Sequence, residues 1–544
     1  MNLMYLARSG LNSAQAGLNV IGNNMNNALT PGYSRQMIML GEAGGKTTSY
    51  GFFGYGVQVD GVQRAYNGFL NNQVRNSSSE YNSLYSRYEN VSQIDNMFGD
   101  LSNNISNAFG GIFESMQKMS SNPSDPAARQ ETYAQFNSIS YKFRTDSNTL
   151  DGLEKSTNTQ ISQSVDDINS YAQQLADVNK EIDKVYGQTG TLPADLLDRR
   201  DLLLEKLSSQ VDIRVNENPQ TGRVDVTLAN GLSLVNGDKA YALEARPSPS
   251  NPNITEVAYI DASGNALLLD EQKFTGGKLG GLFEFRNNDL VTARNELNQL
   301  ALQMANEFNM VNAQGYDAEG NPGGDIFNIS DPVALANRNN QSDTTLDIAY
   351  TNISEVNAVE YNLTFDGTDW QVKTSDGRSI TPDVGPNGEL LFEGISVTPN
   401  GTPEEGDSFI MNPVSGVAGS LTVALTDGKG IAASSSPDTA ESSNNENLLE
   451  LLALKDKKMV GNATFTEAYA SIVSSVGSTT KGLQGNLQTA DKVLNEWALQ
   501  KQSVSGVNMN EEYMNLMMFT EYYQANAQVL QTAVTIFDTI LSIR

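Results

Sequence analysis

The two ends of the chain carry its clearest hydrophobic pattern, in which apolar or small residues recur at alternating intervals of three and four positions. This heptad spacing predicts an α-helix that buries one face against another helix. The N-terminal stripe consists of Met4, Ala7, Leu11, Ala14, Leu18, Ile21, Met25 and Ala28. The C-terminal stripe consists of Leu516, Phe519, Tyr523, Asn526, Leu530, Ala533, Phe537 and Ile540. We predict that the first helix ends at Leu29, because Thr30-Pro31-Gly32 cannot continue it.

Neither terminal helix carries a core of its own. Each would be about 40 Å long, and a lone helix of that length is only marginally stable in water. Each stripe therefore needs a partner, and two arrangements are open: the two helices pair with each other, or both pair with other subunits of an assembly. The small residues Ala7, Gly10, Ala14 and Gly17 favour close helix approach.

The middle of the chain alternates between helical and strand patterns. Apolar spacing predicts helix over 72–180, with one break at Asn122–Pro126, then a helix after Pro193 and another over 277–314. Residues 447–502 are helical again. Alternating patterns such as Val211–Val215, with the hairpin signal Asn230-Gly231, predict β structure over 211–274 and 325–426.

These elements predict an α+β fold, an elongated multi-domain rod. Its helical, coiled-coil-like trunk comes from both termini and the middle helices, and two β-rich domains are inserted in it. The expected division is a terminal helical assembly domain at 1–70 plus 505–544, a helical trunk domain at 71–210 plus 277–315 plus 445–504, a first β-rich insert at 211–276, a second at 325–430, and a Ser-rich linker at 431–444.

Composition removes several classes of function. The 544 residues include 35 Lys and Arg against 64 Asp and Glu, a formal net charge of −29, so we expect no nucleic-acid partner. Cys and His are both absent, which excludes Ser-His-Asp and Cys-His catalysis, Cys/His zinc sites and haem ligated by His or Cys. No stretch reaches the ~20 apolar residues of a membrane span and no secretory signal is recognisable. We therefore expect no membrane partner, and a chain that is cytosolic or leaves the cell without a cleaved signal.

Few residues suggest chemistry. Carboxylate pairs of the kind that a glycoside hydrolase uses occur at Asp198/Asp201 and Glu404/Glu405, but we interpret both as polar surface positions of an acidic chain. The acidic, Gly-rich segment Asp317–Asp325 lacks the spacing and the final Glu of a calcium loop, so a turn is favoured. We predict no catalytic, cofactor-binding or metal-binding residue, no cofactor, and no enzymatic activity.

Segments at both ends and in the trunk resemble the axial proteins of the bacterial flagellum. Residues Ser9–Asn27 resemble the N-terminal helix shared by flagellar rod, hook and hook-associated proteins. Leu192–Asp201 is similar to a helix start of the hook-associated protein 1 family, and Ser503–Glu512, followed by Tyr522–Val529, resembles that family's C-terminal signature. A further motif of that family is matched by Thr30, Pro31, Gly32, Tyr33, Ser34, Arg35 and Gln36.

The resemblance implies a structural ring of subunits that joins the hook to the filament after type III export. The implied partners are other copies of the chain in that ring, the hook protein, the next hook-associated protein on the filament side, and a cytoplasmic export chaperone. The chain would be secreted to the extracellular flagellum after a transient cytoplasmic stage. The two stripes would be subunit interfaces, and the C-terminal stripe would also bind the chaperone. We further hypothesise that both stripes stay mostly unpaired in the free subunit and bury their apolar faces when subunits stack.

Two other functions remain open at this point. A hook or distal-rod type of axial protein would polymerise indefinitely instead of stopping at a thin junction layer. A secreted surface hydrolase, the alternative from a different class, would need a substrate cleft with perturbed carboxylates.

Overall fold

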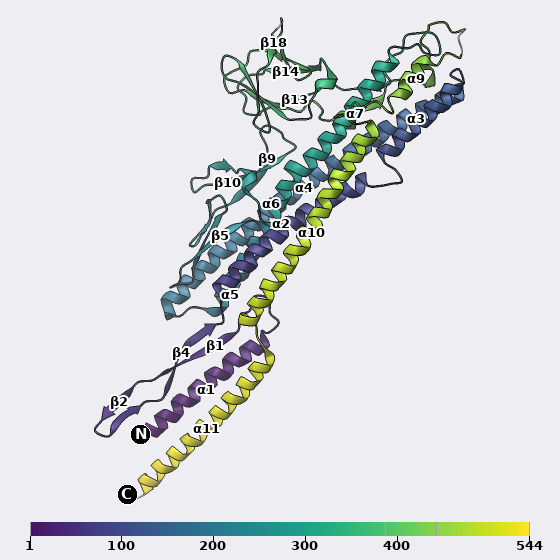
Figure 1. Cartoon of the computed structure of the whole chain (residues 1–544). Coiled ribbons are helices and arrows are strands. Elements are labelled where there is room, and N and C mark those ends of the chain that lie inside the picture. The colour runs from purple at the N-terminus through teal and green to yellow at the C-terminus, as the bar shows by residue number, and fades with distance from the viewer. Residues whose placement is uncertain (1, 387, 441–442, 543–544) are drawn as a thin grey trace.

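The protein is an elongated rod with both chain ends at the same extremity (Figure 1). The structure is a computed structural model that describes residues 2–386, 388–440 and 443–542. The few remaining positions belong to the predicted terminal domain, second insert and linker, and lie outside the described residues. Long helices run along the rod and small antiparallel sheets project from it. The predicted α+β class and the elongated multi-domain shape are confirmed.

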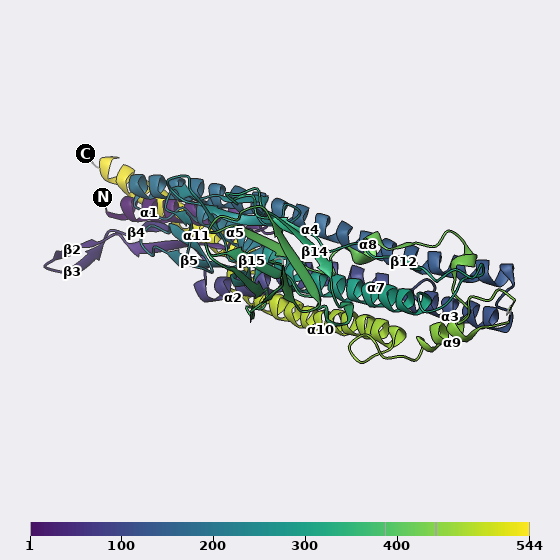
Figure 2. The ribbon, with the colours of Figure 1, turned by 90° about the horizontal axis from the view of Figure 1, so that it is seen from above.

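Nine helices of the described chain build the trunk and lie lengthwise beside one another (Figure 2). The longest has 64 residues and is therefore about 95 Å long. The trunk helices are α2 (Gly68–Phe98), α3 (Ile105–Ser121), α4 (Pro126–Thr189), α5 (Ala194–Gln210), α6 (Gly277–Glu284), the π-helical turn η2 (Phe285–Leu290), α7 (Val291–Asn312), α9 (Glu446–Ala453) and α10 (Phe465–Ser505).

Local signals explain where the longest helix begins and ends. The Asp125 carboxylate accepts a hydrogen bond from the Ala127 N–H, and Pro126 occupies the first turn. Gly190 ends the helix with a φ of 69°, a left-handed conformation that glycine adopts without strain. The predicted single break at Asn122–Pro126 is thus present.

A second break, between α2 and α3, was not predicted. Asp100 forms a turn between them by accepting hydrogen bonds from the N–H and hydroxyl of Ser102. Asn104 then caps α3 by accepting from the Asn107 N–H. The prediction of one continuous helix here was wrong, because side-chain capping at these polar residues competes with the helix.

The first β-rich insert consists of two small antiparallel sheets that lie against α4. One sheet has the strand order β5-β6-β7-β8 and the other β11-β10-β9. Their inward side chains form the proximal core together with α4, α5 and α6. The strands are β5 (Ile213–Glu217), β6 (Val224–Leu228), β7 (Ser233–Asn236), β8 (Lys239–Ala240), β9 (Leu243–Pro247), β10 (Thr255–Ile260) and β11 (Ala266–Leu268).

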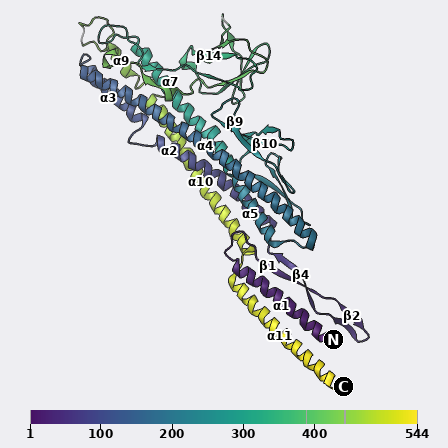
Figure 3. The ribbon, with the colours of Figure 1, turned by 180° about the vertical axis from the view of Figure 1, so that it is seen from behind.

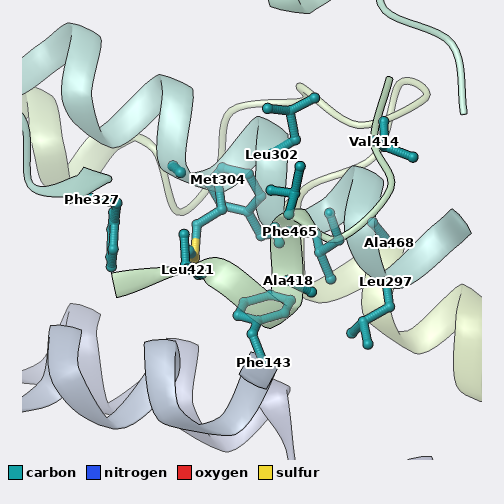
Figure 4. Packing of buried hydrophobic residues seen from close by; sticks show 14 of the residues in the cluster. Phe143, Leu297, Leu302, Met304, Phe327, Val414, Ala418, Leu421, Phe465 and Ala468 are labelled. Carbon is teal, nitrogen blue, oxygen red and sulfur yellow. The ribbon is translucent and has the colours of Figure 1, made fainter. Parts of the chain in front are cut away.

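The second β-rich insert packs its sheets into a separate, distal core. The sheets have the orders β13-β21-β15-β16-β17, β14-β20-β19-β18 and β12-β22. Phe143 of α4, Met304 of α7 and Phe465 of α10 converge in this core (Figure 4). The strands are β12 (Phe327–Asn328), β13 (Ala334–Ala336), β14 (Thr345–Tyr350), β15 (Tyr361–Phe365), β16 (Trp370–Thr374), β17 (Ser379–Ile380), β18 (Asp383–Val384), β19 (Leu390–Phe392), β20 (Ile395–Asn400), β21 (Ser408–Met411) and β22 (Thr422–Val423).

The predicted linker at 431–444 begins as a buried segment rather than as a flexible connection. Ile431, Ala432 and Ala433 are buried. The Asn312 side chain accepts a hydrogen bond from the Ala432 N–H, and Arg129 donates to the Ile431 carbonyl at 2.7 Å. The linker prediction was wrong for these residues. It was based on the serine content of the segment and overlooked the apolar residues with which the segment begins. Residues 441–442 lie outside the described chain.

Candidate interface at the terminal module

The two terminal helices pair with each other in an antiparallel arrangement. Helix α1 (Asn2–Asn26) and helix α11 (Met509–Ser542) lie side by side, as Figures 1 and 3 both show. Facing positions advance by seven residues along one helix while they recede by seven along the other, as a heptad pair requires. The facing pairs are Gly10 with Asn526, Gly17 with Phe519, and Asn24 with Glu512.

Glycine sets how closely these helices approach. A Cβ atom on Gly10 would overlap the Asn526 amide, and one on Gly17 would overlap the Phe519 ring. Of the two arrangements left open by the sequence, the structure of the single chain shows the first, in which the two terminal helices pair with each other. The hypothesis that both stripes lie unpaired in the free subunit does not match the structure, because these glycines let the stripes bury each other.

The residues of the N-terminal stripe differ in how deeply they are buried. Ala7, Ala14 and Ile21 are buried, Leu11, Leu18, Met25 and Ala28 are half-buried, and Met4 is exposed. The fully buried positions between them are Gly10, Ser13, Gly17 and Asn24. Sequence reasoning noted the glycines for close approach but did not include them in the stripe, since it followed the larger side chains.

The C-terminal stripe is less covered. Ala533 is buried, Leu516, Phe519, Asn526 and Leu530 are half-buried, and Tyr523, Phe537 and Ile540 are exposed. The α1 helix covers only one face of α11. Nothing in a single chain tests the predicted role of either stripe as a subunit interface, so that role stays a prediction.

The opposite face of α11 carries a second apolar stripe that sequence reasoning missed. Its members recur at alternating intervals of four and seven residues. The stripe therefore follows the same heptad repeat as the inner one, but on a face turned away from α1. We call it the outer stripe: Met514, Met518, Ala525, Val529 and Ile536, all exposed. An exposed apolar face of this length is typical of a protein interaction site.

The two strand pairs of one long β-hairpin lie on the other side of α1 and complete the terminal module, which we define as residues 2–66 and 507–542. Their strands are β1 (Gln36–Glu42), β2 (Gly45–Thr48), β3 (Gly51–Gly54) and β4 (Val57–Arg64). The prediction of a purely helical domain at 1–70 was wrong here. Strand β1 pairs with β4 residue by residue, with a β-bulge between Met39 and Leu40. Glycines with positive φ at 44, 51 and 56 make the turns and bends.

The hairpin tip adds further exposed apolar surface. Tyr50, Phe52, Phe53 and Tyr55 are all exposed. Most of the exposed large hydrophobic side chains of the described residues lie on the terminal module rather than on the much larger trunk. The module therefore differs from the trunk in its surface chemistry.

Asn24 organises the end of the terminal module that meets the trunk, a contact that we call the joint. Its side-chain oxygen accepts hydrogen bonds from the Tyr33 hydroxyl at 2.8 Å and the Gln36 N–H at 2.9 Å. Its amide donates to the Gln36 carbonyl at 2.8 Å and to Glu512 at 3.0 Å. One buried side chain thus ties α1, the following loop and α11 together.

Arg35 extends the joint to the end of α10. Its Nε lies 2.8 Å from Glu512 Oε1 and its Nη1 lies 2.9 Å from Glu511 Oε2. Its backbone N–H donates to the Ser505 carbonyl at 2.8 Å. The neighbouring Ser34 N–H donates to Asp198 at 2.9 Å, which links the same loop to α5.

A buried cluster of charges closes the joint. Arg64 Nη1 lies 3.0 Å from Asp198 Oδ1 and 2.6 Å from Asp201 Oδ2. Arg200 pairs with Asp201 at 2.7 Å and with Glu217 at 2.9 Å. The interpretation of Asp198 and Asp201 as surface positions was therefore wrong: both are buried because arginines neutralise them.

Burial shifts several pKa values at the joint. Burial, together with the nearby carboxylates of Asp198 and Glu512, raises the pKa of Tyr33 to about 12. Burial, together with Asp201 and Glu217, raises the pKa of Tyr66 to about 12. Burial also raises the pKa of Asp198, against the lowering effect of its hydrogen bonds from Ser34 and Arg64. At neutral pH both tyrosines are protonated and act as hydrogen-bond donors.

Three separate sequence segments meet at the joint. They are the loop 30–36, the helix start 192–201 and the connection 503–512, the segments on which the family resemblance was noted. Sequence reasoning recognised each segment but had no physical account of them. Their contacts supply one, since they fix the terminal module on the trunk.

The candidate chemical sites have structural explanations. Glu404 and Glu405 are exposed in a turn. The Asp317 carboxylate accepts hydrogen bonds from the Glu319 and Asn321 N–H groups of its own loop. Among the described residues, no cluster of three metal-ligating side chains is found, and no helix in that part of the chain is long and apolar enough to cross a membrane.

Four family models match the chain. Residues 91–327 match the flagellar hook-associated protein FlgK helical domain, and residues 335–413 match the D2-like domain of flagellar hook-associated protein 1. Residues 4–33 match the flagella basal body rod protein model, and residues 500–543 match the C-terminal model of flagellar basal body rod FlgEFG proteins.

Curated relatives match over the full length. The chain is 41% identical to flagellar hook-associated protein 1 of Salmonella typhimurium over 553 residues, and 39% identical to that of Escherichia coli over 548 residues, with 100% of each chain covered in both cases. The solved structure of the flagellar hook junction protein FlgK from Burkholderia pseudomallei superimposes with a TM-score of 0.73 at 24% identity, over 80% of this chain and 100% of that one. That likeness shows the fold.

Proposed function

The chain belongs to the flagellar hook-associated protein 1 family, and from this membership we propose that it is the structural subunit that joins the hook to the filament of the bacterial flagellum. Its role is mechanical rather than catalytic. The carboxylate pair Asp198/Asp201, which a hydrolase would need free, is neutralised by Arg64 and Arg200.

The outer stripe of α11 is the observation that carries this proposal. A helix that is apolar on two opposite faces needs a partner on each. The α1 helix covers the inner face, and the outer stripe is left exposed along about four turns or more. In the assembled junction, helices of neighbouring subunits cover it, and burial of its side chains provides the favourable free energy of association.

The joint sets the direction in which this surface is presented. Arg64 connects the terminal module to α5 through buried ion pairs with Asp198 and Asp201. The Arg35 backbone N–H connects it to the end of α10 by donating to the Ser505 carbonyl. Because Arg64 contacts two carboxylates of α5, the module is held in one orientation relative to the trunk. Subunits that all present α11 at the same angle can close a ring.

The partners follow from this arrangement. We propose that copies of the chain contact one another through their terminal modules, with the hook protein on one side and the next hook-associated protein on the other. The exposed apolar residues of α11 are also a suitable surface for a cytoplasmic export chaperone before assembly.

The division of the chain into terminal module, trunk and two β-rich inserts is likewise part of this proposal, as is export to the cell exterior.

The test adds purified protein to isolated hooks and examines them by electron microscopy. Full-length protein should form one thin layer at the distal end of the hook, and a chain that lacks residues 505–544 should not. Long tubes would instead support a hook or distal-rod type of protein. Absence of any binding by the folded full-length chain would contradict the proposal.

A single substitution at an exposed position tests the role of the outer stripe without disturbing the folded structure. Met518→Glu introduces a charge into the stripe, and Met310→Glu is the matched control on α7, since the two side chains are 54% and 52% exposed. We expect Met518→Glu to reduce hook capping about tenfold or more, because an unpaired charge is buried at the contact. Met310→Glu should cap hooks as the unmodified chain does, and equal loss in both variants would refute the role of the stripe.

A further inference from the structure

Methionine is the only sulfur-containing side chain in this protein. The sequence has 16 Met and no Cys. Thioethers are readily oxidised by peroxides to sulfoxides, which are polar and bulkier at the sulfur. The positions of the methionines therefore decide where an oxidant acts on the chain.

Exposure divides these methionines by location. Met116, Met119, Met304 and Met411 are almost completely buried in the distal core. Met514, Met517 and Met518 of α11 are 63%, 52% and 54% exposed. Met310 of the trunk is also 52% exposed, and Met39, Met509 and Met37 of the terminal module follow at 47%, 46% and 43%.

The three exposed residues lie on one face of α11. Their spacing of three and four positions places them on adjacent turns of the same side. Glu512 and Phe519 point to the opposite side, where they contact α1. A chemical change at the three sulfurs therefore alters the surface of α11 without touching its contact with α1.

We propose that Met514, Met517 and Met518 form an oxidation-sensitive site, at which conversion to sulfoxide prevents the free subunit from joining the flagellum. This inference rests on the proposed function, because it assumes that the outer face of α11 is buried on assembly. The site takes peroxides as its oxidant, and it is accessible only before the subunit is incorporated.

The reaction is a two-electron oxygen transfer. A lone pair of the thioether sulfur attacks one peroxide oxygen, the S–O bond forms and the O–O bond breaks. The leaving hydroxide takes up the proton released from the transferred oxygen and becomes water. One thioether and one hydrogen peroxide thus give one sulfoxide and one water, with sulfur oxidised and the peroxide reduced.

The physical consequence is a change from an apolar to a polar surface. A sulfoxide oxygen is a strong hydrogen-bond acceptor, and its burial without a donor opposes association. One such group weakens binding by about tenfold, and three on the same face weaken it further. The trunk should stay folded, because the methionines of its distal core are shielded from the oxidant.

The experiment treats the purified full-length chain with hydrogen peroxide and maps sulfoxides by peptide mass spectrometry. Hook capping by electron microscopy and circular dichroism are then compared before and after treatment. We expect Met514, Met517 and Met518 to oxidise at least about tenfold faster than Met116 and Met304, since their sulfurs are accessible. Capping should fall about tenfold or more while the helical signal is unchanged, and methionine sulfoxide reductase should restore it.

A variant identifies the responsible sulfurs. Met514→Leu/Met517→Leu/Met518→Leu keeps apolar side chains of similar volume, and its own untreated capping serves as its baseline. It should retain most of that baseline after peroxide, whereas Met310→Leu should lose capping as the unmodified chain does. Equal loss in the triple variant, undiminished capping by the oxidised chain, or preferential oxidation of the buried methionines would each overturn the proposal. If the untreated chain fails to cap hooks, the proposed function fails instead, and the oxidation map still tests the site.

Discussion

Asparagine side chains hold the β-rich units on the trunk helices. Asn179 of α4 donates to the Val224 and Gly237 carbonyls, both at 2.7 Å, and accepts from the Val224 N–H at 3.1 Å. Asn169 makes a similar two-way pair with the backbone of Leu243. Such amides satisfy sheet-edge groups that would otherwise be buried without partners.

The Asn179→Ala variant tests this role. It leaves one N–H and two carbonyl groups unpaired in the proximal core, so we expect the free energy of unfolding to fall by about 2–4 kcal/mol. Urea titration measures the change. Asn137→Ala, at an exposed position of the same helix, should change stability by no more than about 0.5 kcal/mol. Similar small effects in both variants would contradict the role of Asn179.

The joint tyrosines predict a loss of stability at high pH. The pKa of Tyr66 is raised from 10.0 to about 12 in the folded chain. Between these two pH values the folded state binds more protons than the unfolded state, so stability falls as the pH rises. The Tyr66→Phe variant should show a shallower decline of the unfolding free energy between pH 10 and 12. Tyr141→Phe, at an exposed ring of α4, should follow the unmodified chain, and an unchanged slope in Tyr66→Phe would refute the assignment.

At this scale the sequence predicted little. Asn24, Asn179 and Asp198 are polar residues whose roles depend on backbone groups far away in sequence. No local pattern distinguishes them from the many Asn and Asp residues on the surface. Their importance follows only from burial with complete hydrogen bonding.

Among the elements, the pairing of α1 with α11 depends on glycine at the contact. A methyl group on Gly17 would overlap Phe519, whereas one on Gly22 of the same helix would meet no atom within 4 Å. The two positions therefore offer a matched pair of substitutions.

Opposite effects are expected from these two changes. Gly17→Ala should separate the helices and lower the hydrogen-exchange protection of α11 by about tenfold or more, because overpacking costs about 1–3 kcal/mol. Gly22→Ala should instead raise the protection slightly, since alanine favours helix by up to about 1 kcal/mol. Hydrogen exchange detected by mass spectrometry measures the protection of the α11 amides in both variants. Equal protection in the two variants would contradict the tight pairing.

The long helices and most strands were predictable because their periodicity extends over many residues. The stripes of α1 and α11 were found, although the buried line on α1 passes through Gly10, Gly17 and Asn24 rather than through the larger residues beside them. The hairpin at 36–64 was missed, since its glycine-rich turns and short strands give little periodic signal. The outer stripe was missed because its heptad overlaps that of the inner one.

At the scale of the whole molecule, two large hydrophobic cores that share no residue are found among the described residues. The distal core joins the second insert to α3, α4, α7 and α10, and the proximal core joins the first insert to α4, α5 and α6. Helix α4 passes through both. Separate cores of this kind lead to unfolding in more than one step.

The two tryptophans report on two different regions of the rod. Trp370 packs against Phe365 and Phe409 in the second insert, and Trp497 of α10 packs against Phe69 of α2. In the single-tryptophan variants Trp370→Phe and Trp497→Phe, we expect urea transitions with different midpoints. Circular dichroism of both variants should coincide with the unmodified chain. Coincident fluorescence midpoints would show that the rod unfolds as one unit.

The antiparallel pairing of the two ends makes the finished chain a condition for its own assembly surface. Asn24 and Glu512 touch although 488 positions separate them in the sequence. A chain that stops early, or that has been cut near either end, keeps its trunk but has no partner for the helix that remains. On the proposed function, the terminal module is therefore a check of completeness, because only an intact copy contains both paired helices.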